Sequence, residues 1–327
     1  QTITFVPPSS SSQSQIMATS VQSFETSHED VIHDAQLDYY GKRLATCSSD
    51  RTIKIFDVTN DQKKQVGEIK GHEGPVWQVA WAHPQFGSVL ASCSYDHKVI
   101  IWREQTAGVW TKINEYKHNS SVNSIAWAPH ELGLILASAS SDSSIMIVSY
   151  NEQKNAWDTK VIQGAHQIGC NAICWAPSAI SGSLLTTSTD KPTLVKKLLS
   201  GGGDNTAKVW TFDGENWVKE AELKNHSDWV RDVAWAPNIG LPYDLIATAS
   251  QDQSVWIYTR EQSSGQWTAV NQLKFESVVW RVSWSLTGNI LAVTTADGKV
   301  TLYKEGLEAN EWTILAEMGN SQTNQQQ

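Results

Sequence analysis

One stretch of the sequence, residues 71–102, constrains the fold more than any other part of the chain. It reads GHEGPVWQVAWAHPQFGSVLASCSYDHKVIIW and contains three short strand patterns, the first of which alternates apolar and polar residues. Gly71-His72 opens the stretch, Asp96 lies in a tight turn before the third pattern, and Trp102 closes it. Such a unit forms a small antiparallel sheet, and the fold of the chain depends on whether it recurs.

The unit recurs six times. Its opening position is occupied by His28, His72, His118, His166, His226 and Phe275. The aspartate of its last turn recurs as Asp50, Asp96, Asp142, Asp204, Asp252 and Asp297, at intervals of 46, 46, 62, 48 and 45 residues. A Gly-His opening and a Trp-Asp type ending at this period are the signature of the WD repeat, which forms one four-stranded propeller blade. We therefore predict an all-β fold, a WD-repeat β-propeller of six blades.

The repeats define a single domain with an extension at each end. We divide the chain into a disordered or weakly ordered lead, the propeller and a polar tail, at residues 1–27, 28–318 and 319–327. Repeat four is lengthened by an insertion near 178–199, which we place in a surface loop. Met17 has the context of a natural start, so we expect residues 1–16 to be an upstream extension or an isoform-specific tail.

Composition argues against several classes of function. The net charge is −9 at pH 7 and no run of Lys or Arg occurs, so nucleic acid or an anionic membrane is not the expected ligand. No apolar segment is long enough to insert into a membrane. The four cysteines lack His or Cys neighbours at zinc spacing, so we expect buried thiols in a reducing compartment and no metal or other cofactor.

The repeats also raise the question of how the ring closes. Each repeat carries a candidate for a fourth, outermost strand, and the copy at 312–318 follows the third strand of repeat six. Blade six can thus complete itself from the C-terminal end, although the segment VQSFE (21–25) could compete for that position. If 21–25 does not take it, blades one and six share no strand. Their facing apolar surfaces then form a seam of the kind that marks an interaction site.

The polar residues that recur with each repeat have the residue types of a hydrolase triad. They are His72, Ser92, Asp96 and Trp102 in repeat two, His166, Ser200, Asp204 and Trp210 in repeat four, and His226, Thr248 and Asp252 in repeat five. A catalytic group is needed once, whereas this set recurs, so we predict a structural hydrogen-bond network and no enzymatic activity. Repeat six lacks the network because Phe275 and Val293 replace its His and Ser.

A second recurring set lies at the start of each innermost strand, where it would ring one mouth of the central channel. Its members are His33, Trp77, Asn123, Asn171, Arg231 and Trp280. Trp and Arg are frequent in binding hot spots, but aromatic residues at a crowded mouth also pack on neighbouring blades, and we favour packing. Asp34 and Asp232 each follow a basic residue, with which we expect them to pair.

Four longer segments carry a resemblance to a known family. They are DYYGKRLATCSSDRTIKIF, GHEGPVWQVAWAHPQFGSVLASCSYD, SVNSIAWAPHELG and HSDWVRDVAWAP. Together they closely resemble the small six-repeat WD subunits of the outer COPII coat, a family shared with the Y-shaped scaffold of the nuclear pore. The other small propeller of that scaffold shares the IHD and TCSSD elements, but GHEGPVW and HSDWVRDVAWAP fit the coat subunits better.

The resemblance implies an open propeller that acts as a scaffold. In this family a long α-helical partner inserts strands as a seventh blade between blades six and one. The implied hetero-oligomers contain an α-helical solenoid coat protein of the COPII outer cage or a helical nucleoporin of the Y-shaped complex, and a nutrient-signalling complex is a third setting. The implied locations are the cytoplasmic face of the ER membrane and COPII vesicles in ER-to-Golgi transport, the nuclear pore complex, and the cytosol.

These expectations place the partner seam on both sides of the opening. We predict that it uses Ile32, Asp34 and Ala35 of the first blade and Val279, Val282 and Trp284 of the last. Inserted strands would supply backbone pairing for affinity and alternate side chains for specificity. The alternative function is a peptide-binding WD-repeat adaptor that uses the channel mouth.

Overall fold

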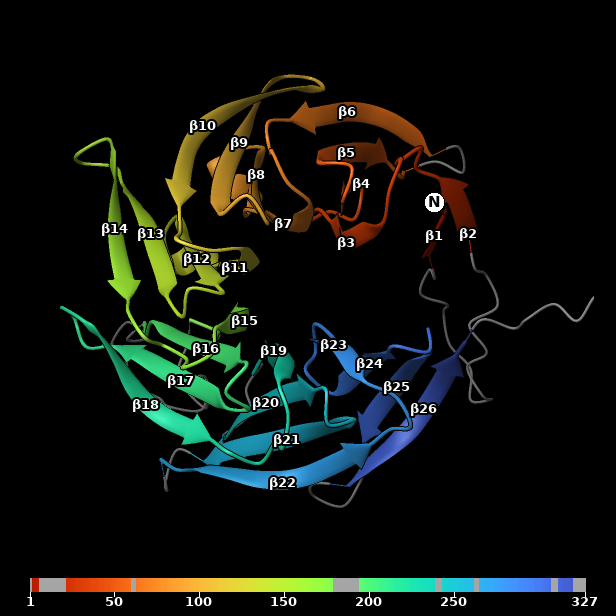
Figure 1. Ribbon diagram of the computed structural model, residues 1–327, viewed down its shortest axis with the longest axis vertical. Coiled ribbons are helices and arrows are strands. Elements are labelled where there is room, and N and C mark those ends of the chain that lie inside the picture. The colour runs from red at the N-terminus through yellow and green to blue at the C-terminus, as the bar shows by residue number, and fades with distance from the viewer. Residues whose placement is uncertain are drawn as a thin grey trace, which may run out of the picture.

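Six four-stranded antiparallel sheets follow one another around a common axis in the computed structural model (Figure 1). The structure describes residues 2–5, 22–59, 63–178, 194–238, 243–261, 265–306 and 311–319. Within each sheet the strands lie in chain order, with the first strand nearest the axis (Figure 1). The predicted all-β, six-bladed propeller is thereby confirmed.

The first three blades contain strands β3 to β14. Blade one consists of β3 (Ile32–Leu37), β4 (Arg43–Ser48), β5 (Thr52–Asp57) and β6 (Lys64–Lys70). Blade two consists of β7 (Val76–Trp81), β8 (Val89–Ser94), β9 (Lys98–Thr106) and β10 (Val109–Lys117). Blade three consists of β11 (Val122–Trp127), β12 (Ile135–Ser140), β13 (Ile145–Asn151) and β14 (Ala156–Ile162). Short 3-10 turns follow β7 and β11, at η1 (Pro84–Phe86) and η2 (His130–Leu132).

The last three blades contain strands β15 to β26. Blade four consists of β15 (Cys170–Trp175), β16 (Lys197–Gly202), β17 (Ala207–Phe212) and β18 (Trp217–Leu223). Blade five consists of β19 (Val230–Trp235), β20 (Tyr243–Ser250), β21 (Ser254–Glu261) and β22 (Trp267–Lys274). Blade six consists of β23 (Val279–Trp284), β24 (Ile290–Thr295), β25 (Val300–Glu305) and β26 (Trp312–Met318). Most of the insertion predicted near 178–199 lies outside the described residues.

Blade six takes its outermost strand from the C-terminal end of the chain. β26 pairs antiparallel with β25 from Met318 opposite Val300 to Trp312 opposite Glu305. The competing segment forms β2 (Gln22–Glu25), which pairs with β1 (Thr2–Phe5) and with no strand of blade six in the described structure. Blades one and six therefore share no strand.

Within the described residues, no helix has the length and apolar character needed to cross a membrane.

The hydrophobic core lies between successive blades, because each sheet packs one face against the blade before it and one against the blade after it. All six residues of β8, VLASCS, are buried. Leu90 packs in a cluster with Cys47 of blade one, whereas Val89 and Cys93 pack in a cluster with Ile125 of blade three. Small side chains let the backbones of neighbouring blades approach closely. The thiols of Cys47 and Cys93 thus lie buried and free, and burial raises their pKa.

Each innermost strand carries a register shift after its first residue, typical of a β-bulge. The shifts fall between Ile32 and Asp34, Val76 and Gln78, Val122 and Ser124, Cys170 and Ala172, Val230 and Asp232, and Val279 and Arg281. The skipped residue of each strand has no opposite partner and is the one predicted for the channel mouth. A bulge also shifts the alternation by one, so the first and fourth residues of the strand face the same neighbouring blade.

Candidate functional site

Two kinds of hydrogen bond tie neighbouring blades together at the innermost strands. In the first kind, the tryptophan that ends the strand donates Nε1–H to a carbonyl of the preceding blade. The bonds run from Trp81 to Gln36, Trp127 to Ala80, Trp175 to Ala126 and Trp284 to Ala234, at 2.8–3.2 Å. Blade one has Leu37 at this position, so it offers no donor to blade six.

In the second kind, the third residue of the innermost strand accepts a hydrogen bond from a backbone N–H of the following blade. The acceptors are Asp34 for Val79, Gln78 for Ile125, Ser124 for Ile173 and Asp232 for Val282, at 2.8–3.3 Å. Blade six has Arg281 here, and a guanidinium group cannot accept a hydrogen bond. The junction from blade six to blade one thus lacks both kinds of bond.

The junction of blades four and five shows that packing decides whether neighbouring blades join. Ala172 offers no acceptor there, and the buried Nε1 of Trp235 has no hydrogen-bond partner in the described structure. Yet β15 and β19 pack closely, and Ala172, Val233 and Trp235 share one buried cluster. β23 and β3 do not pack in this way, unlike the other five pairs of neighbouring innermost strands (Figure 1). The ring is therefore open between blades six and one.

One ionic contact spans the opening near the axis. The Nη2 atom of Arg281 lies 3.8 Å from Oδ1 of Asp34, whose side chain is 8% exposed against 44% for the arginine. Burial raises the pKa of Asp34, and it raises the pKa of Asp232 to about 6, while Arg281 lowers both. The expected pairing of each aspartate with the basic residue before it is wrong, because that residue stands on the bulge and points to the channel mouth.

The wall that blade six presents to the opening is an uncovered version of an interblade face. Leu291, Val293 and Tyr303 pack with blade five, so the residues that alternate with them face the opposite way. Those residues are Ile290, Ala292, Thr294, Val300 and Leu302, and all are half-buried. The corresponding residues of blade two, which blade three covers, are Val89, Ala91, Cys93, Val99 and Ile101, at 0–1% exposure. Blade six therefore presents an apolar wall that lacks a neighbouring blade.

The wall of blade one is contacted by the end of the lead. Leu44 and Phe56 face the opening, yet each is only 2% exposed. The ring of Phe24 meets that of Phe56 edge-on at 5.2 Å. Nζ of Lys54 donates to the carbonyl of Ser27 at 2.6 Å. The two walls of the opening thus differ, because the end of the lead contacts that of blade one.

The structure divides the six residues predicted for the seam. Ala35 is exposed at the opening. Ile32, the first residue of β3, faces the same side as Ala35 and is half-buried. Val279 and Val282 instead lie in the buried cluster that blade six shares with blade five, and Trp284 packs against that cluster. These three residues hold blades five and six together. The blade-six residues that face the opening lie on the opposite face of the sheet, which carries Ile290, Ala292 and Leu302.

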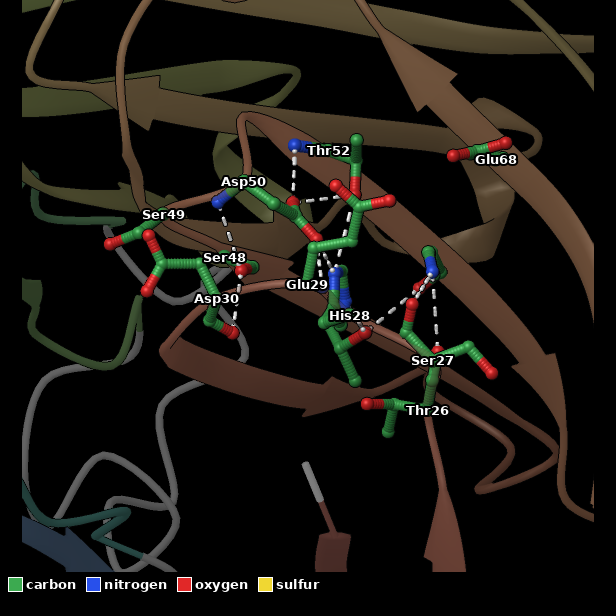
Figure 2. Close-up of polar contacts among 12 residues, drawn as sticks. Thr26, Ser27, His28, Glu29, Asp30, Ser48, Ser49, Asp50, Thr52 and Glu68 are labelled. Atoms are coloured by element: carbon green, nitrogen blue, oxygen red, sulfur yellow. Dashed lines mark hydrogen bonds and ion pairs between the residues drawn. The ribbon is translucent and has the colours of Figure 1, made fainter.

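The predicted polar network is present in the blades where it was placed. In blade two, Nδ1 of His72 lies 2.9 Å from Asp96, its Nε2 lies 2.7 Å from Oγ of Ser92, and Trp102 Nε1 donates to that hydroxyl at 2.8 Å. The same contacts join His166, Ser200, Asp204 and Trp210, and the His, Thr and Asp contacts recur for His226, Thr248 and Asp252. In blade one, Nδ1 of His28 lies 2.7 Å from Asp50, as Figure 2 shows, and its Nε2 lies 2.8 Å from Oγ1 of Thr46.

Burial and hydrogen bonding have opposite effects on the pKa of each titrating group in this network. Burial lowers the pKa of His28, His118 and His166, which favours the neutral ring. Hydrogen bonds from side chains and backbone outweigh burial at Asp50 and Asp96 and lower their pKa to about 2. These shifts favour the neutral ring of the three histidines and the ionised form of the two aspartates at neutral pH, and each group has its partners within its own blade. The arrangement closes the opening turn of the blade onto its sheet.

All six residues predicted for the channel mouth line one cavity of about 650 Å³. Most of them contact neighbouring blades: Trp77 donates to Ser121, Asn123 to the carbonyl of Cys170, and Asn171 to the carbonyl of Val230. The ring centroids of His33 and Trp77 lie 4.4 Å apart. The guanidinium of Arg231 stacks over Trp229 and over Trp280, which is 46% exposed. The mouth thus combines packing between blades with a half-buried arginine that stacks on exposed tryptophan rings.

Comparison with known proteins places these features in a family. Two family models match the chain, one described as WD domain, G-beta repeat, over 18–57 and 63–103. The other, described as Anaphase-promoting complex subunit 4 WD40 domain, matches 87–179 and 233–311. A Protein SEC13 homolog of Dictyostelium discoideum is 52% identical over 93% of this chain and 100% of its own length. Protein transport protein sec13 of Schizosaccharomyces pombe is 52% identical (90% and 99% covered), and a Protein SEC13 homolog of Drosophila melanogaster is 50% identical (84% and 78%).

Proposed function

Because the chain belongs to the SEC13 family of non-enzymatic WD-repeat propellers, we propose that it is a scaffold subunit that binds and stiffens an elongated α-helical partner. The partner donates strands that complete a seventh blade between blades six and one. The observation that carries this proposal is the apolar wall of blade six, which has the residue types of a covered interblade face and no blade to cover it.

The proposed assemblies are those of protein transport, the function that the names of several relatives give them. The main partner is an α-helical solenoid coat protein of the COPII outer cage, in ER-to-Golgi transport. A helical nucleoporin of the nuclear pore Y-shaped scaffold is the second partner, and a nutrient-signalling complex is a third setting. The corresponding locations are the cytoplasmic face of the ER membrane and COPII vesicles, the nuclear pore complex, and the cytosol.

The two walls of the opening support a large and stable interface. Donated strands would lie against the blade-six wall on one side and against the wall of blade one on the other. An interface of this kind buries about 2,000 Å² or more and resembles a domain core. Burial of an additional leucine or isoleucine contributes about 1.5–3 kcal/mol, so the wall around Ile290, Val300 and Leu302 can supply much of the affinity. The partner thereby becomes part of the propeller's core.

A charge on the blade-six wall tests the proposal. Leu302 is half-buried and faces the opening, so Leu302→Asp should leave the free propeller folded. The lost leucine burial and the desolvated carboxylate should together weaken binding of a helical coat partner's strand segment on the order of 100-fold or more. Ile314→Asp is the matched control, because Ile314 is 56% exposed and lies opposite Tyr303, which faces blade five.

Isothermal titration with the strand segment gives the affinities, and thermal melting of each free variant reports its folding. Unchanged binding by Leu302→Asp would remove the opening as the binding site. The alternative, a peptide-binding adaptor, is favoured by one observation: the guanidinium of the half-buried Arg231 stacks over the exposed ring of Trp280 at the channel mouth. It predicts that Trp77→Ala combined with Arg231→Ala abolishes binding while Leu302→Asp has no effect.

A further inference from the structure

The strands β1 and β2 lie where a seventh blade would lie. Figure 1 shows both between the sheets of blades one and six, with β1 on the side of β2 nearer the axis. β2 ends at Glu25, three residues before His28. β18 likewise ends at Leu223, three residues before His226, and it is the outermost strand of the blade that precedes that histidine. By this correspondence, β2 is the outermost strand of an otherwise incomplete seventh blade.

A bond that recurs in the ring supports this correspondence. Nζ of Lys54 donates to the carbonyl of Ser27, the residue before His28, at 2.6 Å. Nζ of Lys208 donates to the carbonyl of Ala165, the residue before His166, at 2.8 Å. Lys54 and Lys208 hold the same register in the third strands of blades one and four. The chain thus enters blade one as it enters blade four, where a complete blade precedes it.

β1 pairs with β2 along its whole length. The opposite residues are Thr2 and Glu25, Ile3 and Phe24, Thr4 and Ser23, and Phe5 and Gln22. In the six complete blades, the outermost strand pairs with the third strand of its own blade, as β6 does with β5 and β26 with β25. β1 therefore stands in the third-strand position of the seventh blade.

We propose that β1 is an internal placeholder, which occupies the edge of β2 until a partner's strand replaces it. This inference rests on the proposed function, since the donated blade needs the same edge. An unpaired strand edge exposes N–H and C=O groups that invite pairing with other chains, and β1 satisfies those of β2 in the free protein. A pairing of two four-residue strands is marginal in stability, so a longer donated blade can displace it.

Removal of β1 is the direct test. A chain that begins at Met17 lacks β1 and keeps β2, and the probe is the strand segment of a helical COPII coat partner. We expect this chain to bind about tenfold more tightly than the full chain, because the full chain binds only in the fraction of molecules whose β2 edge is free. In the absence of the probe, hydrogen exchange should show β2 amides protected in the full chain and unprotected in the shorter one.

A crosslink supplies the opposite perturbation. Thr4→Cys with Ser23→Cys places two thiols opposite each other in register, so oxidation should tie β1 to β2. The oxidised variant should bind the segment at least tenfold more weakly, and reduction of the same sample, the matched control, should restore binding. Equal affinity of the full chain, the chain from Met17 and the oxidised variant would overturn the placeholder while leaving the proposed function intact. If none of them binds the segment, the proposed function fails, and the placeholder fails with it.

Discussion

Replacement of Asp204 by alanine measures what the recurring polar network contributes to stability. The carboxylate accepts hydrogen bonds from His166 Nδ1 at 2.8 Å, from the backbone N of Gln167 at 3.1 Å, and from the backbone N and hydroxyl of Thr206 at 3.3 and 2.8 Å. Nζ of Lys208 lies 3.1 Å away and is 9% exposed. Alanine would leave a buried ring and a buried ammonium without their shared acceptor. Removing one partner of such a set costs about 3–5 kcal/mol of unfolding free energy.

Asp297→Ala is the matched control, because Asp297 holds the same turn position in blade six. Its side chain is 35% exposed and contacts Thr295 and Lys299, with no histidine in the opening position. Exposed contacts of this kind contribute about 0–1 kcal/mol. Urea unfolding followed by tryptophan fluorescence gives both values. If Asp204→Ala lost no more stability than Asp297→Ala, the network would not be what closes the blades.

Three further outcomes follow from the contacts of the ring. Trp127→Phe removes a hydrogen bond to a carbonyl of blade two and should lower the free energy of unfolding in urea by about 1 kcal/mol. Trp235→Phe should lower it by less, because Nε1 of Trp235 has no hydrogen-bond partner in the described structure. The melting temperature should decrease as the pH is lowered from 3.8 to about 2. The reason is that the pKa of Asp50 and Asp96 is lowered to about 2 in the fold, so stability present above 3.8 is lost as they gain protons. Val282→Asp should destabilise the free propeller by at least about 3 kcal/mol, unlike Leu302→Asp, because Val282 is buried against blade five.

The sequence predicts the number of blades well because the recurring polar residues bond inside their own repeat. His72 and Asp96, for example, belong to one repeat and meet at 2.9 Å. Such local chemistry keeps the same residue types in each repeat, although the His-to-Asp separation varies from 22 residues in blade one to 38 in blade four. The sequence alone left open whether 21–25 or 312–318 completes blade six. The structure uses 312–318, in agreement with the tendency of consecutive strands to pair.

The facing of the innermost strands could not be predicted from alternation alone. Val279 and Val282 are an odd number of residues apart, and simple alternation places them on opposite faces, yet both pack on blade five. The bulge after Val279 accounts for this, and no local residue pattern identified it. The contact between Arg281 and Asp34 was also missed, because it joins the two ends of the ring and depends on the position of every blade between them.

The order of the strands along the chain explains why the ring is open, why the wall of blade six is uncovered and why the edge of β2 can pair with another strand. The strand at Trp312–Met318 follows β25 directly and completes blade six, so β2 is not needed there. β2 nevertheless precedes His28 and joins blade one, as an outermost strand does elsewhere in the ring. The chain therefore has the outer strand of a seventh blade without its inner strands. The wall around Leu302 lacks its neighbour for the same reason, and a partner that supplied those strands would cover the wall and pair with β2 in one step.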